Sequence, residues 1–167
     1  TEIYTLSLHD ALPILQVKDF AIINVEKAMM NSEIGFGRKL LQALEEQGIS
    51  FEHMPSGIDT MCVVVHEDAI VGKKEKLMQR IHELCAPDSV EIHSGLALIA
   101  TVGRGMVRSK GISARLFNAL MKAGINVRLI DQGSSELNII VGVDNLDFEN
   151  AVRAIYRAFV VKENNRW

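Results

Sequence analysis

Apolar residues along this chain gather in short clusters separated by polar, glycine-containing segments. Two clusters, FAIINV at 20–25 and LALIATV at 96–102, are continuous and rich in β-branched residues, which predicts buried strands. Shorter apolar runs bounded by turn residues predict further strands at 49–54, 60–65, 90–93, 125–130 and 137–143.

Helical periodicity appears in four other segments. Residues 35–47 and 111–123 each carry one apolar face, and Gly48 and Gly124 follow where a left-handed cap ends a helix. Two later segments, around 77–85 and 151–159, have the same apolar spacing. The four predicted faces are Phe36, Leu40, Leu41 and Leu44; Ile112, Leu116, Phe117 and Leu120; Leu77, Met78, Ile81 and Cys85; and Ala151, Val152, Ile155 and Phe159.

The pattern repeats at a distance of 76 residues, the separation of Gly35 and Gly111. In this register Leu40 matches Leu116 and Gly48 matches Gly124, among other identities. A sustained match predicts two copies of one structural unit. The element order is βαββαβ, which predicts an α+β fold of two ferredoxin-like modules, each an antiparallel sheet with both helices on one face.

The repeat sets the expected domain boundaries at 17–94 for the first module and 95–161 for the second, with a polar tail at 162–167. The second module has no predicted closing strand. Residues 1–16 join poorly to this pattern and are similar to translated adapter sequence, so we expect this segment to be extraneous. Finding it encoded contiguously in genomic DNA would contradict that expectation.

Composition narrows the classes of function. The net charge of −3 and the pI near 5.9 argue against nucleic-acid binding, and no apolar run is long enough to cross a membrane. Two cysteines and five scattered histidines lack disulfide or metal-ligand spacing, which predicts a cytoplasmic protein without metal or other cofactor. Gly103-Arg104-Gly105 lacks the remainder of a phosphate-binding motif, and we assign no catalytic residue.

Two stretches resemble a known family. VEKAMMNSEIGFGRKLLQALEEQGISFEHMPSGIDTMCVVV at 25–65 and GISARLFNALMKAGINVRLIDQGSSELNIIVGV at 111–143 are similar to the two ACT modules of lysine-sensitive bacterial aspartate kinases, and the resemblance covers about 17–160. It implies an allosteric regulatory region that mediates feedback inhibition of the first step of aspartate-family biosynthesis. The effector implied is L-lysine or a related amino acid.

The resemblance also implies partners. In the family an amino-acid-kinase catalytic domain precedes the modules, and none of its motifs occurs in this chain. In the family the two modules are entwined, since a strand before the first completes the sheet of the second. The resemblance also implies a homodimer with the effector at or near the seam.

An amino-acid effector needs amide donors for its carboxylate, acceptors for its ammonium and, if lysine, a carboxylate for its side chain. The loop before the first helix offers exposed amides and cap-type side chains, and glycines there let a ligand approach the backbone. Gly37 stands where some members have a bulkier residue. With the resemblance added, the expected effector-binding residues are Met29, Asn31, Ser32, Gly35, Phe36, Gly37, Glu52, Ser56, Gly57 and Ile58.

Other interpretations stay open. Asn31 and Ser32 could simply cap a helix, and Glu52 could be a solvated charge at a strand edge. The second module has Arg128 where the first has Glu52, with Arg104, Arg108 and Lys110 in its loop, so we expect it to be structural.

Three rival functions share this topology. They are a free-standing regulatory subunit of a kinase, an RNA-recognition-like module and an acylphosphatase-like enzyme. The aliphatic central strands disfavour the second, and Arg104 is the sole candidate residue for the third.

Overall fold

The computed structural model describes residues 14–103, 106 and 109–160. The expected tail at 162–167, most of the expected extraneous segment, and Arg104 and Arg108 lie outside the described residues. Within the described part of the chain, no helix has the length and apolar character needed to cross a membrane.

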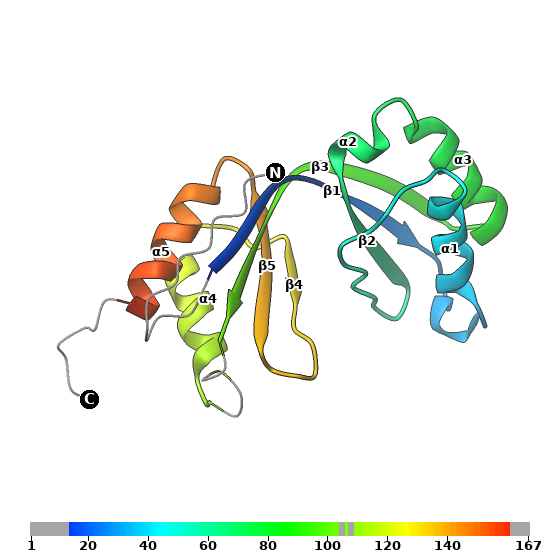
Figure 1. The fold of residues 1–167 in the computed structure, drawn as a ribbon. Coiled ribbons are helices and arrows are strands. Elements are labelled where there is room, and N and C mark those ends of the chain that lie inside the picture. Colours follow the sequence, from blue (N-terminus) through cyan, green and yellow to red (C-terminus); the bar gives the residue numbers. More distant parts are fainter. Residues whose placement is uncertain (1–13, 104–105, 107–108, 161–167) are drawn as a thin grey trace. The chain divides into compact units, whose positions relative to one another are not determined.

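The chain divides into two compact units. The first unit comprises Asp19–Gly95, and the second comprises Leu96 onward together with the chain up to Lys18. Two strands, β1 (Ile14–Glu26) and β3 (Ser89–Val102), therefore contribute residues to both units. Hydrogen-bonded neighbours follow the order β2-β1-β3-β5-β4, as labelled in Figure 1.

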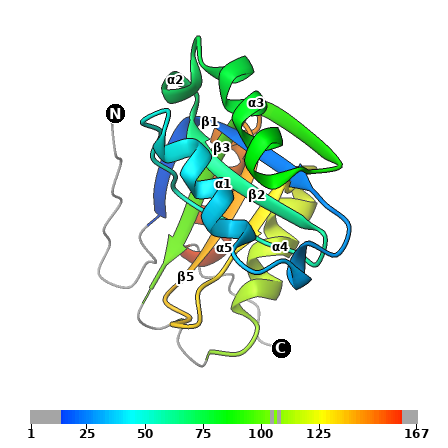
Figure 2. The same ribbon diagram turned by 90° about the vertical axis from the view of Figure 1, so that its right-hand side faces the viewer.

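In the first unit, β1 pairs antiparallel with β2 (Thr60–His66), which places Ala21 opposite Val65 and Ile23 opposite Val63. Helices α1 (Phe36–Glu45) and α3 (Lys74–Cys85) lie side by side over one face of these strands (Figure 2). Alternate strand residues point to that face and form a core with the helices, because side chains in a strand alternate between its two faces. The core includes Ala21, Ile23, Val25, Leu40, Leu44, Val63, Val65, Leu77, Ile81 and Cys85.

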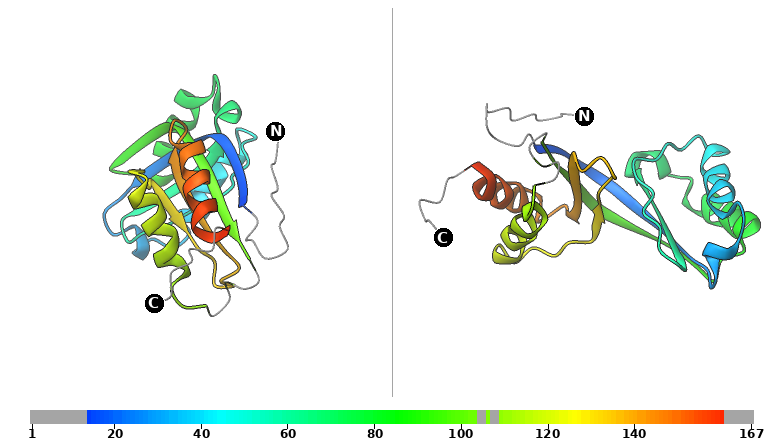
Figure 3. Two further views of the ribbon diagram at one scale, coloured as in Figure 1. Left: turned by 90° about the vertical axis from the view of Figure 1, so that its left-hand side faces the viewer. Right: turned by 90° about the horizontal axis from the view of Figure 1, so that it is seen from below.

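The second unit repeats this arrangement. There β3 pairs antiparallel with β5 (Asn138–Asp144), and β5 pairs with β4 (Leu129–Asp131). Helices α4 (Ile112–Lys122) and α5 (Phe148–Val160) lie side by side on one face of the strands (Figure 3). Its core includes Ala97, Ile99, Leu116, Leu120, Ile139, Val141, Val143, Ala151 and Ile155.

The predicted α+β class, with antiparallel strands and helices on one face, is confirmed. The glycine caps are also confirmed, since Gly48 and Gly124 have φ angles of 63° and 70°. Two strands predicted separately at 90–93 and 96–102 form one continuous strand, β3, which passes through Gly95 at φ 77°. The short elements η1 (Met30–Ser32) and α2 (Glu67–Ile70) were not predicted.

The predicted strand at 49–54 was wrong in extent. The structure has isolated bridges there, His53 with Val64 and Ser56 with Met61. Pro55 lies between them; its carbonyl accepts from the Cys62 amide at 2.8 Å, but it has no N–H to donate to β2, so the pairing stays incomplete. The strand predicted at 125–130 is likewise shortened to the three residues of β4.

Candidate functional site

The loop between β1 and α1, residues 27–35, lies against the turn at residues 55–59. The Lys27 amide donates to the Asp59 carbonyl at 2.9 Å, and the Asn31 amide donates to the Ile58 carbonyl at 3.2 Å. The Met29 amide donates to Oδ1 of Asp59 at 2.7 Å. The structure therefore brings together two segments of the chain that the sequence singled out separately.

The loop has an unusual backbone at two positions. Met29 has φ 59° and Gly35 has φ 81°, both in the left-handed region. Glycine reaches this region without steric cost, but a residue with a side chain does so at some cost in free energy. The carboxylates of Asp59 and Asp88, which accept from the amides of Met29 and Ala28, offset that cost.

An ionic cluster that sequence reasoning missed joins this loop to α1. Glu33 accepts from Lys27 Nζ at 2.5 Å through one oxygen and from Lys39 Nζ at 2.6 Å through the other. The two lysine hydrogen bonds lower the pKa of the Glu33 carboxyl below its ordinary value. A spacing of six residues on either side of Glu33 fits no simple helical pair, so the local sequence gave no signal.

Most of the predicted loop and turn residues offer accessible groups. Met29 and Ile58 are each 70% exposed, and Asn31 and Ser32 are exposed beside them. Ser56 and Gly57 are exposed in the facing turn. Phe36 differs, because its side chain is 3% exposed and belongs to the core of the first unit.

The proposed capping role of Asn31 and Ser32 does not apply to α1. The residue at its N-cap is Gly35, and no described side chain makes a capping hydrogen bond there. The first amides of α1 therefore stand at a helix N-terminus that favours negative charge. Gly37 lies within this first turn, and a Cβ at that position would meet the Cε of Met61 at 3.6 Å.

Glu52 lies apart from the loop and turn. Its amide donates to the Val64 carbonyl at 2.8 Å, and its carboxylate is 3.5 Å from Nε2 of His66. Val64 is four positions along β2 from Thr60, a distance of about 13 Å at the usual rise per strand residue. Within one copy of this chain, Glu52 and the 27–35 loop are thus not part of one cluster.

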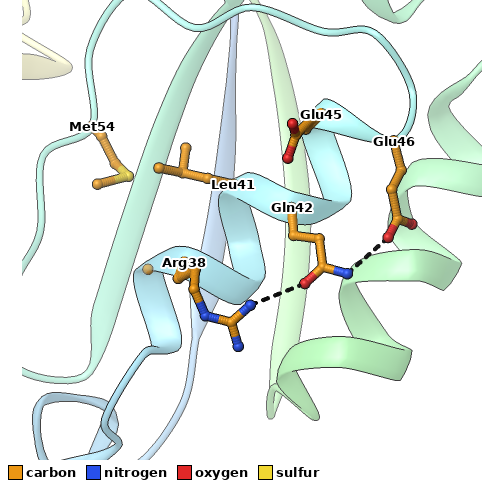
Figure 4. A pocket seen from close by; sticks show the side chains of 7 residues that line it. Arg38, Leu41, Gln42, Glu45, Glu46 and Met54 are labelled. Atoms are coloured by element: carbon orange, nitrogen blue, oxygen red, sulfur yellow. Dashed lines mark hydrogen bonds between the residues drawn. The ribbon is translucent and has the colours of Figure 1, made fainter.

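An open groove runs between α1 and the segment that carries Met54 (Figure 4). Its volume is about 830 Å³, and Leu41 and Met54 face each other across it. Arg38 donates to Gln42 at 3.2 Å and Gln42 to Glu46 at 2.8 Å along its helical wall. A second groove of about 590 Å³ shares Leu41 and Glu45 and reaches Phe51. The grooves thus extend from Gly37 to the immediate neighbour of Glu52.

In the second unit, the position that corresponds to Glu52 is Arg128, which has a positively charged side chain. The Arg128 amide donates to the Gly142 carbonyl at 2.8 Å, and its guanidinium lies 3.9 Å from the carboxylate of Asp144. A cationic ligand side chain would meet repulsion there, whereas Glu52 in the first unit would attract it.

Comparisons with known proteins agree with this architecture. Residues 99–159 match the ACT domain family. Aspartokinase 3 of Bacillus subtilis is 41% identical over 141 residues, which cover 84% of this chain and 31% of that protein.

Solved structures give the same result. The aspartate kinase of Clostridium acetobutylicum is 50% identical, with a TM-score of 0.86 over 95% of this chain and 36% of that one. E. coli aspartokinase III in complex with lysine and aspartate is 21% identical, with a TM-score of 0.71 over 90% of this chain and 33% of that one, a likeness of fold.

The chain spans about one third of the length of these relatives. Its two units carry the same topology, and its second unit contains the matched domain. Residues 99–159 match the ACT domain family, and the homologues and structural neighbours of the chain are aspartate kinases.

Proposed function

We propose that this chain is the allosteric, amino-acid-binding regulatory region of an aspartate kinase and that its first unit binds L-lysine. The observation that carries the proposal is the hydrogen-bonded contact between the 27–35 loop and the 55–59 turn, next to the groove on α1. The homology to aspartokinases supports the identity of the enzyme that is regulated.

The chemistry of the groove suits an amino acid. The α-carboxylate would accept hydrogen bonds from the amides at the start of α1, near Gly35 and Gly37, where the helix dipole is favourable. The apolar stem would lie on Leu41 and Met54. A carboxylate is then needed for the far ammonium, and Glu52 of a second copy would supply it, since Glu52 of the same copy lies apart from the loop beside His66.

We further propose that the site is completed at a seam between two copies of the chain. Glu52 and the 27–35 loop are separated within one copy, so a ligand that needs both would contact two subunits. Such a ligand would favour one mutual orientation of the subunits, and the kinase domains of the whole enzyme would respond to it. This coupling is reciprocal, so substrate binding would weaken lysine binding.

Strand exchange between the two modules is part of the same proposal. The division of the chain supports it, because residues up to Lys18 group with Leu96 onward. Nζ of Lys18 also lies 4.5 Å from the ring centroid of Phe148 at the start of α5. The first segment of β1 would thus serve as the closing strand that the second module lacks. The two free cysteines, Cys62 and Cys85, fit a reducing, cytoplasmic setting.

Isothermal titration of the chain with L-lysine and, in parallel, L-threonine tests the proposal. We expect heat of binding for lysine and none for threonine. Binding of threonine alone would refute the assignment of the effector. Absence of binding by both would refute a complete effector site in this chain, and the same titration on the enzyme with its kinase domain would then show whether that domain is required.

A further inference from the structure

The 27–35 loop is tied to a distant part of the first unit as well as to the 55–59 turn. Nζ of Lys27 donates to the carbonyl oxygen of Cys85 at 2.7 Å, at the C-terminal end of α3. The neighbouring amide of Ala28 donates to Oδ2 of Asp88 at 2.7 Å. We name residues 85–89, which join α3 to β3, the α3–β3 corner.

Two more bonds hold the corner to the end of β1. The Asp88 amide donates to the Glu26 carbonyl at 2.8 Å, and the Ser89 hydroxyl donates to Oε2 of Glu26 at 3.1 Å. Consecutive residues of the chain, 26, 27 and 28, are therefore all bonded to the corner. The corner has an unusual backbone conformation, since Ala86 has φ 43° in the left-handed region.

Lys27 also makes the bond that fixes the far side of the loop. The same ammonium that donates to Cys85 donates to Glu33, and Glu33 accepts from Lys39 on α1. The Lys27 side chain is 23% exposed, so its ammonium is partly shielded from water where it donates to Glu33 and to the Cys85 carbonyl. Lys27 thus joins the loop to the end of α3, and Glu33 joins the loop through Lys39 to the first turns of α1.

From this geometry we infer that Lys27 is a positioning residue that clamps the 27–35 loop to the α3–β3 corner and makes the start of β3 respond to effector binding at the loop. The inference deepens the proposed function and rests on it for the identity of the effector. A ligand that shifts the loop must shift Lys27 and the Ala28 amide, and both have their acceptors in the corner. The corner leads directly into β3, and residues of β3 beyond Gly95 belong to the second unit, so the clamp holds the start of a strand that both units share.

Amide hydrogen exchange of the whole chain tests the clamp without ligand. The variants are Lys27→Met, which keeps the aliphatic stem, and Lys27→Arg, which keeps the charge; Lys76→Met, an exposed lysine on α3, is the matched control. In Lys27→Met we expect exchange at 28–32 and 86–89 to be about tenfold faster than in the wild type, with core amides of β1 and β2 unchanged. Lys27→Arg should restore slow exchange in part. Equal rates in Lys27→Met and Lys76→Met would overturn the clamp.

The response to effector is tested by repeating the exchange with L-lysine. In the wild type we expect slower exchange at both the loop and the corner, and in Lys27→Met slower exchange at the loop alone. Equal slowing at the corner in both proteins would overturn the role of Lys27 in coupling. Asp88→Asn removes the charge of the acceptor of the Ala28 amide and leaves Lys27 unchanged. This variant should also show less slowing of exchange at the corner when L-lysine is added. A wild-type chain without any response to L-lysine would overturn the proposed effector, whereas the ligand-free comparison decides the clamp by itself.

Discussion

The backbone amide of Met29 donates a 2.7 Å hydrogen bond to Oδ1 of Asp59. This bond holds a left-handed residue of the 27–35 loop against the facing turn. Asp59→Ala should therefore loosen the loop and raise the Kd for L-lysine about five- to tenfold, because a preorganised loop loses less entropy on binding. Isothermal titration measures the change. Asp59→Asn retains an acceptor, so its Kd should be closer to that of the wild type. An unchanged Kd in Asp59→Ala would contradict a role for this bond.

The two units should respond differently to charge substitutions at corresponding positions. Glu52→Ala removes the carboxylate expected to bind the lysine side chain and should lower affinity about tenfold or more, the usual worth of a charged hydrogen bond. Arg128→Glu in the second unit should leave affinity unchanged, because Arg128 is bonded to Gly142 and lies near Asp144. Calorimetry on both variants decides the point. Equal losses of affinity would undo the proposed asymmetry.

The pair of Glu46 at the C-cap of α1 and Arg80 on α3 should give the first unit an acid-sensitive stability. Oε2 of Glu46 lies 2.6 Å from Nε of Arg80, and this bond, with a second from Gln42, lowers the pKa of Glu46 from 4.5 to about 2. Because the folded pKa is the lower one, the stabilisation is present above pH 4.5 and is lost as the pH falls from 4.5 towards 2.

Urea unfolding between pH 2 and pH 7 measures this dependence. Arg80→Met removes the partner, so its midpoint should fall less steeply than that of the wild type across the window. Lys76→Met, on the same helix, serves as the control and should keep the wild-type slope. Parallel curves for Arg80→Met and the wild type would show that the pair contributes nothing to acid sensitivity.

Gly142 on β5 leaves no room for a side chain. A Cβ there would lie 2.9 Å from the Cβ of Leu129 and 3.0 Å from Cδ1 of Leu96. Gly142→Ala should destabilise the second unit by about 1–3 kcal/mol, the usual cost of overpacking. Gly133→Ala is the control, since its Cβ would meet Ser135 Oγ at 3.8 Å. Thermal unfolding compares the two, and similar midpoints would show that the strands adjust freely.

Thr101 on β3 is fully buried, and its hydroxyl has no hydrogen-bond partner among the described residues. Its counterpart 76 positions earlier in the repeat is Val25. Thr101→Val should stabilise the chain by about 1 kcal/mol, because a buried hydroxyl without a partner costs free energy that a methyl group does not. Chemical denaturation checks this. A destabilised variant would indicate that the hydroxyl is bonded in solution.

Much of the fold was predictable from local pattern. The repeat, the buried strands around Ile23 and Ile99, and the faces of α1 and α4 follow from apolar spacing, because burial of one face imposes a period on the sequence. The caps at Gly48 and Gly124 follow from backbone sterics alone. For the candidate site, the sequence identified the 29–37 and 52–58 segments as candidates for effector binding. It did not show that the two segments contact each other.

Only the tertiary structure decided how those segments combine. The edge segment that contains His53 pairs irregularly with β2 because Pro55 has no N–H to donate, and the strand-like composition of the segment concealed this. Glu52 contacts His66 rather than the loop, and Lys27 reaches Cys85, which is 58 residues away. Periodicity records which face of an element is buried, since that depends on near neighbours in the chain. Contacts between polar groups far apart in sequence leave no period, so they become visible only once the elements have packed.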